Sequence, residues 1–446
     1  MSEKYSDGGA ERGIPQQTAD RALIRGIGRW ALTAFSINIT IGAGIFGLPA
    51  HVQAIVGNYS AFAIVACGML MTGIALCFAE IASRFDRSGG PQLYGSIALG
   101  PAGGFIVGWL LWLSRLGTCA AVSTLLVDYG TLLWPPLGAV VARTAVICAL
   151  VGGYTWLNIR GIRQTSLVSV VFTVFKLLPL IAFVAVGLFF IDPRSLHLGA
   201  APSLTNASNA ILLAAFAFLG FDAATVLGGE IRDVRRAIPF AILLSMGIVL
   251  VLYTLIQIVC AGALPNLATS QRPLADAAVM FIGPAGGTVI ALAAIIACAG
   301  VFGASMTPGT RLLFAMADQG QIPTALARLH PRFATPVLAI LITAAAILLL
   351  ALSGSFIYLV KVTLIARVTV FALMCLLLPL FRGRRDVPEA QFKVPAGKFV
   401  AYGGAIVCML FLANSSIPEL IDVAAAAGTG LVIFGITRIT QKRRTA

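Results

Sequence analysis

Apolar segments of about twenty residues follow one another along almost the whole chain, and this is the length that an α-helix needs to cross a bilayer. About twelve such segments can be drawn, separated mostly by short loops. The composition agrees, since 59% of the 446 residues are hydrophobic and only 11% are charged. A soluble protein of this size cannot bury so much apolar surface. We therefore expect an all-α integral membrane protein of twelve spans.

The chain is expected to form a single membrane domain over residues 1–446, with tails at 1–28 and 439–446. No room is left for a separate soluble domain. The spans are expected at about 30–56, 59–84, 92–133, 139–157, 165–190, 207–230, 238–264, 284–318, 336–352, 356–381, 401–412 and 418–436.

The basic residues alternate between the two sides of these spans. Most of the 31 Lys and Arg fall in the tails and in every second loop, whereas the other loops hold little beyond Arg143, Arg194 and Arg272. Because Lys and Arg concentrate on the cytoplasmic side, both termini are expected to be cytoplasmic. The net charge of +14 then reflects membrane topology and not nucleic-acid binding. We expect a multi-pass protein of the cytoplasmic (inner) membrane, with the lipid bilayer as its surroundings.

The stretch from Asn38 to Pro49 interrupts the first span with three glycines and a proline, which are poor helix formers. In hydrocarbon an unwound backbone is tolerated only where it is buried in protein or lines a watery cavity. Such a break exposes amides at the start of one half-helix and carbonyls at the end of the other, which attract a carboxylate and a cation respectively. A zwitterion needs both. The alternative is that these small residues merely let helices pack closely.

A second interruption, Phe218 to Asp222, lies in the middle of the span at 207–230. Two interrupted helices five helices apart indicate an inverted repeat of 29–190 and 207–381, with peripheral helices 11 and 12 at 399–438. Discontinuous helices at matching positions in two halves are typical of a transporter binding site near the middle of the membrane.

Several separated motifs resemble those of the amino acid–polyamine–organocation (APC) transporters. They are I-G-A-G-I-F-G-L-P at 41–49, F-A-F-L-G-F-D at 216–222 followed by Glu230, R-R-A-I-P at 235–239, and R-L-L-F-A-M-A-D-Q-G-Q-I-P at 311–323. The resemblance covers about residues 28–440. It implies the leucine-transporter fold, with ten helices in two inverted five-helix repeats plus two extra helices. It also implies secondary active transport of amino acids or related amines by alternating access.

The resemblance also implies a substrate site at the two breaks. The substrate carboxylate is expected at Gly42, Ala43 and Gly44, and the amine at carbonyls near Thr40 and at the second break. Phe216 is expected to act as a gate over the substrate. Ser114 and Cys119 share a helix face with Arg115, which aligns with a substrate-facing position. The expected substrate-binding residues are Thr40, Ile41, Gly42, Ala43, Gly44, Ser114, Arg115, Cys119, Phe216 and Leu219.

Ionisable side chains inside the spans are further candidates, because a charge at mid-bilayer costs about 3 kcal/mol or more. The resemblance places Lys176 beside the first break, as either a proton carrier or a fixed ammonium bonded to carbonyls. Asp222 is either a proton-sensing acid or a carboxylate that caps amides or pairs with a cation. Arg115 and Arg367 are expected to pair with an acid, Asp222 or Asp128, or to bind a substrate carboxylate. Lys176 and Asp222 are the proton-coupling candidates.

Other classes of protein fit less well. The histidines His51, His197 and His330 have no metal-ligand spacing, and no G-x-x-x-x-G-K-[ST] loop is present, so we expect neither an enzyme, nor a metal site, nor a cofactor. A channel is the stronger alternative, since glycine-rich breaks also build selectivity filters. The prediction is a permease for a neutral or possibly acidic L-amino acid, proton-coupled or an exchanger. The alternative is an exchanger of amino acids or amines without proton coupling.

Overall fold

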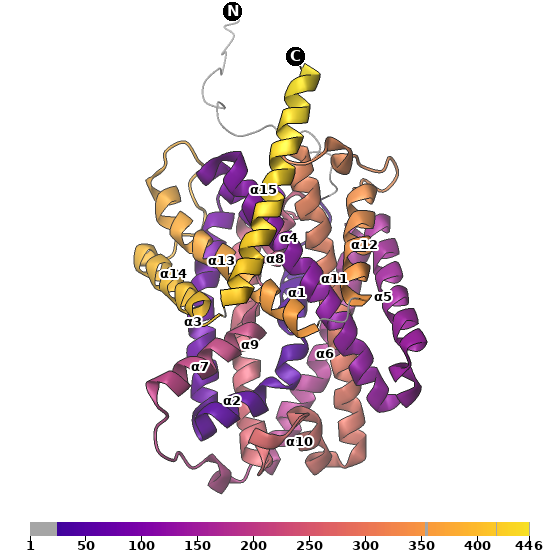
Figure 1. The fold of residues 1–446 in the computed structure, drawn as a ribbon. Helices are drawn as coiled ribbons and strands as arrows, with labels where there is room; N and C mark the ends of the chain where they lie inside the picture. Colours follow the sequence, from indigo (N-terminus) through magenta and orange to yellow (C-terminus); the bar gives the residue numbers. More distant parts are fainter. Residues whose placement is uncertain (1–24, 353–355, 416, 446) are drawn as a thin grey trace, which may run out of the picture.

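The computed structural model describes residues 25–352, 356–415 and 417–445. In this part of the chain the regular elements are helices, and an isolated parallel bridge joins Ile27 and Ile231. Figure 1 shows a helical bundle in which α2 and α10 lie at the end opposite the one where α15 finishes. The expected all-helical class is confirmed. Residues 1–24 and 446 of the expected tails lie outside the described residues, as do the side chains of 441–445.

The α-helices, in chain order, have the following bounds. They are α1 (Arg29–Thr40), α2 (Leu48–Val56), α3 (Ser60–Ala82), α4 (Pro91–Leu133), α5 (Val140–Arg160), α6 (Ile162–Gly187), α7 (Leu204–Ala215), α8 (Ala223–Val226), α9 (Val234–Ala263), α10 (Pro273–Ile282), α11 (Pro284–Asp318), α12 (Val337–Leu352), α13 (Phe356–Gly383), α14 (Gly397–Ala413) and α15 (Ile417–Thr445).

Nine helical runs among the described residues are long and apolar enough to cross a membrane. Large apolar side chains cover their outer surface, among them Phe189, Val141 and Leu204, which are 80–90% exposed and suited to lipid. The chain is therefore a multi-pass membrane protein. This criterion gives fewer than the expected twelve spans, because α12 and α14 are shorter and the first span is broken. The nine runs are Leu48–Ala82, Pro91–Leu133, Val140–Arg160, Thr165–Phe190, Leu204–Val226, Val234–Ala263, Pro284–Asp318, Val362–Gly383 and Ile417–Thr440.

The first expected span consists of two helices, α1 and α2, with the short 3-10 helix η2 (Ala43–Phe46) between them. Gly42 has an extended backbone, with φ −96° and ψ −168°, which cannot continue an α-helix. Pro49 lies in the first turn of α2, where its missing N–H leaves no intrahelical hydrogen bond unmade. The break predicted from the glycines and the proline is therefore present.

The second interruption is also present and is longer than expected. α7 ends at Ala215, and a 3-10 helix, η7 (Phe216–Phe218), leads to Leu219, whose backbone is extended. Gly220 has φ +125°, a conformation that L residues rarely adopt. The chain then forms only one α-helical turn, α8, and a 3-10 turn, η8 (Gly228–Glu230), before α9.

Two pairs of long helices pack along each other, α4 on α11 and α3 on α9. α4 is kinked where Gly100, at φ +81°, precedes Pro101. The sequence analysis missed α10, which occupies a stretch taken as outer loop. It also began the eleventh helix at 401 instead of Gly397 and ended the twelfth at 436 instead of Thr445.

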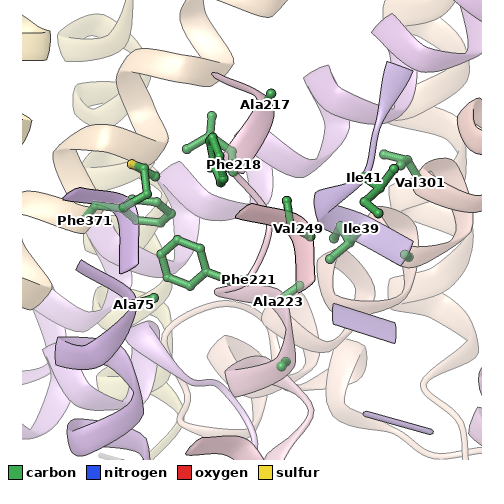
Figure 2. Packing of buried hydrophobic residues seen from close by; sticks show 14 of the residues in the cluster. Ile39, Ile41, Ala75, Ala217, Phe218, Phe221, Ala223, Val249, Val301 and Phe371 are labelled. Carbon is green, nitrogen blue, oxygen red and sulfur yellow. The ribbon is translucent and has the colours of Figure 1, made fainter. Parts of the chain in front are cut away.

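Apolar side chains fill the space around the second break. Figure 2 shows Phe218, Phe221 and Phe371 on one side, and Ile39 and Ile41 of the first break on the other. The Phe221 ring lies 5.1 Å from that of Phe371 and 5.4 Å from that of Phe78, measured between ring centroids. This packing fixes the non-helical segment between η7 and α8, and so holds the second break against the first.

Candidate functional site

The two broken segments lie side by side. A Cβ atom on Gly44 would be 3.5 Å from Cδ1 of Phe216, and one on Gly220 would be 3.0 Å from the carbonyl oxygen of Ile39. The hydroxyl of Tyr253, on α9, lies 3.2 Å from the Thr40 oxygen and 3.3 Å from the Ala217 oxygen. One buried side chain therefore ties the end of α1 to the 3-10 turn that follows α7.

The first break presents both kinds of backbone group. Ala43, Gly44 and Ile45 begin η2, so their amides have no preceding carbonyl within that helix. Gly42 and Gly44 are partly accessible, although Ile41 and Ile45 beside them are fully buried. Gly42, Ala43 and Gly44 thus lie in one turn of backbone, in which the Gly42 N–H donates to the Thr40 oxygen at 2.9 Å. The side chain of Ala43 lies outside the described part.

Lys176, on α6, reaches the first break. Its Nζ donates to the carbonyl oxygens of Asn38 and Ile41, both at 2.8 Å, and its side chain is fully buried. The side-chain Nδ2 of Asn38 in turn donates to Ser169 Oγ at 2.9 Å and to the Gly300 carbonyl oxygen at 3.1 Å. The Lys176 ammonium thus donates to carbonyl oxygens that have no intrahelical partner at the end of α1. These contacts are compatible with both roles considered for Lys176, a fixed cation or a proton carrier.

Arg115 and Asp222 form an ion pair between α4 and the second break, with side chains 1% and 0% exposed. Of the two acids considered for Arg115, the structure selects Asp222. Asp128 pairs instead with Arg143 at 2.9 Å near the surface. The pair is incompletely bonded, because Arg115 Nε and Nη1 and Asp222 Oδ1 have no hydrogen-bond partner among the described residues.

Arg367, on α13, brings a second cation to the same place. Its Nε donates to Ser114 Oγ at 3.2 Å, and its Nη2 donates to Thr118 Oγ1 at 3.4 Å. Because Ser114 precedes Arg115, two guanidinium groups lie near a single carboxylate. The buried surroundings of Asp222 therefore carry an excess of positive charge.

The remaining expected site residues are distributed unevenly. Leu219 and Phe216 belong to the second break, and the Phe216 ring, 39% exposed, lies over Gly44. Cys119 is buried and its thiol donates to the Phe302 oxygen at 3.5 Å, so it faces α11. Ser114, Arg115 and Asp222 form a separate polar cluster with Arg367.

Sequence reasoning missed a second buried ion pair beyond the same break. Arg311, on α11, donates from Nε to Glu230 Oε1 at 2.9 Å, and its Nη2 lies 2.8 Å from the same oxygen. Both residues occur in the motifs quoted above, but nothing in their spacing indicates that they meet. Together with the Arg115–Asp222 pair, this contact holds the segment from Asp222 to Glu230 against α4 and α11.

A cavity of about 250 Å³ lies outside the first break, between α4, α10 and α11. Phe46 of η2 and Tyr129 line it, with ring centroids 6.3 Å apart. Arg272 and Asp276 are the charged residues in its lining. α10 builds one wall of this cavity, so the helix that sequence analysis missed contributes to the space beside the break.

Replacing Gly220 by Ala should destabilise the protein by about 1–3 kcal/mol, because the positive φ is strained for alanine. The new Cβ would also press on the Ile39 oxygen at 3.0 Å. Thermal unfolding in detergent measures the effect. Gly247→Ala on α9 is the matched control, since a Cβ there meets nothing within 4 Å. Equal thermal midpoints for the two variants would contradict the close approach of the breaks.

A bundle of membrane helices in which two broken helices lie side by side is typical of transporters. Comparison with known proteins identifies the kind of transporter. The family model described as amino acid permease matches residues 27–436, so the chain belongs to the amino acid permease family, within the APC superfamily. The substrate implied by this family is a small molecule of the amino acid type.

Relatives of known name are also transporters. The chain is 25% identical to the branched-chain amino acid permease of Bacillus subtilis over 94% of each chain. It is 29% identical to the serine/threonine exchanger of the same organism, over 72% of this chain and 75% of the relative. It is also 27% identical to the methylthioribose transporter of Bacillus subtilis over 90% of each chain. All three names describe proteins that transport or exchange small molecules.

Proposed function

We propose that this protein carries an amino acid across the cytoplasmic membrane by alternating access, with the substrate held between the two helix breaks. The observation that carries the proposal is the junction at Tyr253, which holds the end of α1 and the turn after α7 within hydrogen-bond distance of one hydroxyl. Two half-helix ends that meet in this way provide donors and acceptors for a zwitterion at one place.

The architecture proposed for this carrier is the leucine-transporter fold. Residues 29–190 form the first repeat and 207–381 the second, entering the membrane from opposite faces, and 399–438 form the peripheral helices. Two packings support this reading, since α3 packs on α9 and α4 on α11, and these helices are the second and third spans of the two proposed repeats. With the broken first helix, α12 and α14 included, twelve spans result and both termini are cytoplasmic.

The substrate carboxylate is proposed to bind the amides of Gly42, Ala43 and Gly44. The amine is proposed to bind carbonyls of Thr40 and Ile41. The Ile41 oxygen accepts one hydrogen bond, from Lys176, and keeps a second lone pair. The Thr40 oxygen accepts from Tyr253 and from the Gly42 N–H at 2.9 Å, so the amine would replace one of these donors. The Phe216 ring over Gly44 is proposed as the gate, with Leu219 at the second break.

The side chain of the substrate is proposed to be neutral. The names of two relatives, a branched-chain amino acid permease and a serine/threonine exchanger, favour small neutral amino acids. A second candidate is an acidic amino acid, favoured by the positive excess of Arg115 and Arg367 over Asp222. Such a substrate would place its side-chain carboxylate against Ser114, Arg115 and Cys119.

Coupling to a proton is proposed through Lys176 and Asp222. Lys176 donates to carbonyls of the first break, and Asp222, in the second break, pairs with Arg115. A change in the charge of either group would therefore alter the contacts of one of the two segments that must move. A carrier that exchanges amino acids without a proton is the alternative.

Transport into proteoliposomes tests the function. Vesicles loaded with unlabelled branched-chain or hydroxy amino acids should take up the labelled amino acid above equilibrium by counterflow. Competition with each of the twenty amino acids then identifies the substrate. An imposed proton gradient, with the outside more acidic than the inside, should drive accumulation, whereas a sodium gradient should not. Flux without counterflow would contradict the carrier proposal and indicate a channel, and accumulation driven by sodium alone would contradict proton coupling.

A further inference from the structure

A polar pocket of about 630 Å³ lies at the ends of α3 and α13, away from the helix breaks. Its lining is strongly basic, and the two lining acids are Glu80 and Glu389. Nothing in the proposed transport cycle uses this pocket. The basic residues that line it are Arg84, Arg382, Arg384, Arg385 and Lys393.

The acid at the base of the pocket is already neutralised. Glu80 is 0% exposed, and Arg382 donates to both of its oxygens, from Nε at 2.8 Å and from Nη2 at 2.6 Å. The backbone N–H of Val394 donates to Oε2 at 2.7 Å. A Cβ on Gly397 would lie 2.2 Å from Arg382 Nη2, so this glycine leaves the space that the guanidinium occupies. Glu80 is therefore shared between Arg382, which contacts it closely, and Arg84, whose Nη2 lies 3.8 Å from Oε1.

The loop that forms the outer wall is fixed to the helix ends. The N–H of Phe392 donates to Ser83 Oγ at 3.2 Å, and Arg84 Nη1 donates to the Pro388 oxygen at 3.1 Å. Arg235, at the start of α9, donates from Nε to the backbone oxygen of Ser83 at 2.8 Å and from Nη2 to the backbone oxygen of Glu389. The pocket is therefore a built cavity and not a gap beneath a loose loop.

The cations of the pocket outnumber its acids. Arg84 Nη2 lies 3.8 Å from Glu80 Oε1, on the carboxylate that Arg382 already holds, and Lys393 pairs with Glu389 at 3.2 Å. Arg84 is 6% exposed, and its Nε has no hydrogen-bond partner among the described residues. Burial lowers the pKa of the Arg84 guanidinium, Glu80 and Glu389 raise it, and the neighbouring Arg382 and Arg235 lower it. Arg385 is exposed and makes no ion pair with another described residue. An anion in the pocket would supply the missing acceptors and offset this crowding of positive charge.

We infer that this pocket binds the phosphate group of an anionic ligand. Guanidinium groups match phosphate oxygens by paired hydrogen bonds, and about 630 Å³ accommodates a headgroup or a small phosphate compound. The pocket lies where two membrane helices end on the arginine-rich face, which is where basic pockets meet lipid headgroups. A phosphatidylglycerol headgroup and a soluble phosphate compound share this chemistry.

The test uses the purified full-length protein in nanodiscs. Discs of phosphatidylglycerol should raise the thermal midpoint by about 3 °C or more over discs of phosphatidylcholine. A rise on adding inorganic phosphate or ATP in phosphatidylcholine discs would identify a soluble ligand instead. The same midpoint in all of these conditions would overturn the inference.

Variants separate the pocket from general surface charge. Arg385→Gln combined with Lys393→Gln should abolish the rise, since both side chains line the pocket and neither fills the core. Arg84→Lys keeps the charge but removes Nε and should reduce the rise. Lys398→Gln is the control, because Lys398 is exposed on α14 and does not line the pocket. Equal loss in the control and in the double variant would overturn the assignment to this pocket.

Discussion

Asp222→Asn should destabilise the folded protein by about 3–5 kcal/mol, because it leaves the buried Arg115 guanidinium without its counter-ion. Arg367 adds to the effect, since it is held by Ser114 beside Arg115. Transport should be lost together with the stability. Unfolding in detergent by heat or by sodium dodecyl sulfate measures the first effect, and counterflow in proteoliposomes measures the second.

The matched control for this variant is Asp128→Asn. Asp128 forms the exposed pair with Arg143, with side chains 50% and 35% exposed, and such pairs contribute about 1 kcal/mol or less. If Asp222→Asn costs no more than this control, the Arg115–Asp222 pair is not the buried contact described above.

A double variant separates stability from transport. Arg115→Met with Asp222→Met should recover most of the lost stability, since apolar side chains often replace a buried ion pair without loss. If the pair acts only as a structural contact, transport should recover with it. A stable double variant that does not transport would show that the charges themselves are needed in the cycle.

Lys176→Arg should abolish accumulation driven by a pH gradient but keep counterflow. A guanidinium still donates to the Asn38 and Ile41 oxygens that Lys176 now contacts, and arginine does not release its proton. With one proton moved per substrate, a gradient of one pH unit supports about tenfold accumulation in the unchanged protein. Labelled substrate inside proteoliposomes, measured with and without the gradient, gives this ratio.

Lys176→Met completes the comparison. It removes the cation and leaves the two carbonyls without their donor, so counterflow and thermal stability should both fall. If Lys176 is a fixed ammonium, Lys176→Arg should instead accumulate substrate as well as the unchanged protein does. Full accumulation by Lys176→Arg would therefore exclude Lys176 as the proton carrier.

The sequence allowed the prediction of those parts of the fold that depend on local chemistry. Glycine and proline at 42–49 break the first span wherever it packs, and Pro284 and Asp318 mark the ends of α11 as expected. α10 was missed because its ten residues, which begin with Pro273, are too few to resemble a span. The positive φ of Gly220 was also not predictable, since it depends on the approach of Ile39 from another helix.

The candidate site could be predicted only in outline. The glycines of the first break were expected to meet the second break, and the contact of Gly44 with Phe216 agrees with that. Which acid would meet Arg115 was open, because the answer depends on how α4 is rotated in the bundle. The pair of Glu230 and Arg311 was missed for the same reason, since the two residues are 81 positions apart. The binding roles of the site residues remain predictions.

The Tyr253 hydroxyl has only one proton, yet it faces two carbonyl oxygens, at 3.2 Å from Thr40 and 3.3 Å from Ala217. At any instant the proton is therefore donated to only one of the two oxygens. A bond to Thr40 joins the two proposed repeats, whereas a bond to Ala217 stays within the second, because Ala217 and Tyr253 both lie in residues 207–381. The two breaks can thus separate without leaving this buried hydroxyl unsatisfied, which lowers the cost of parting them.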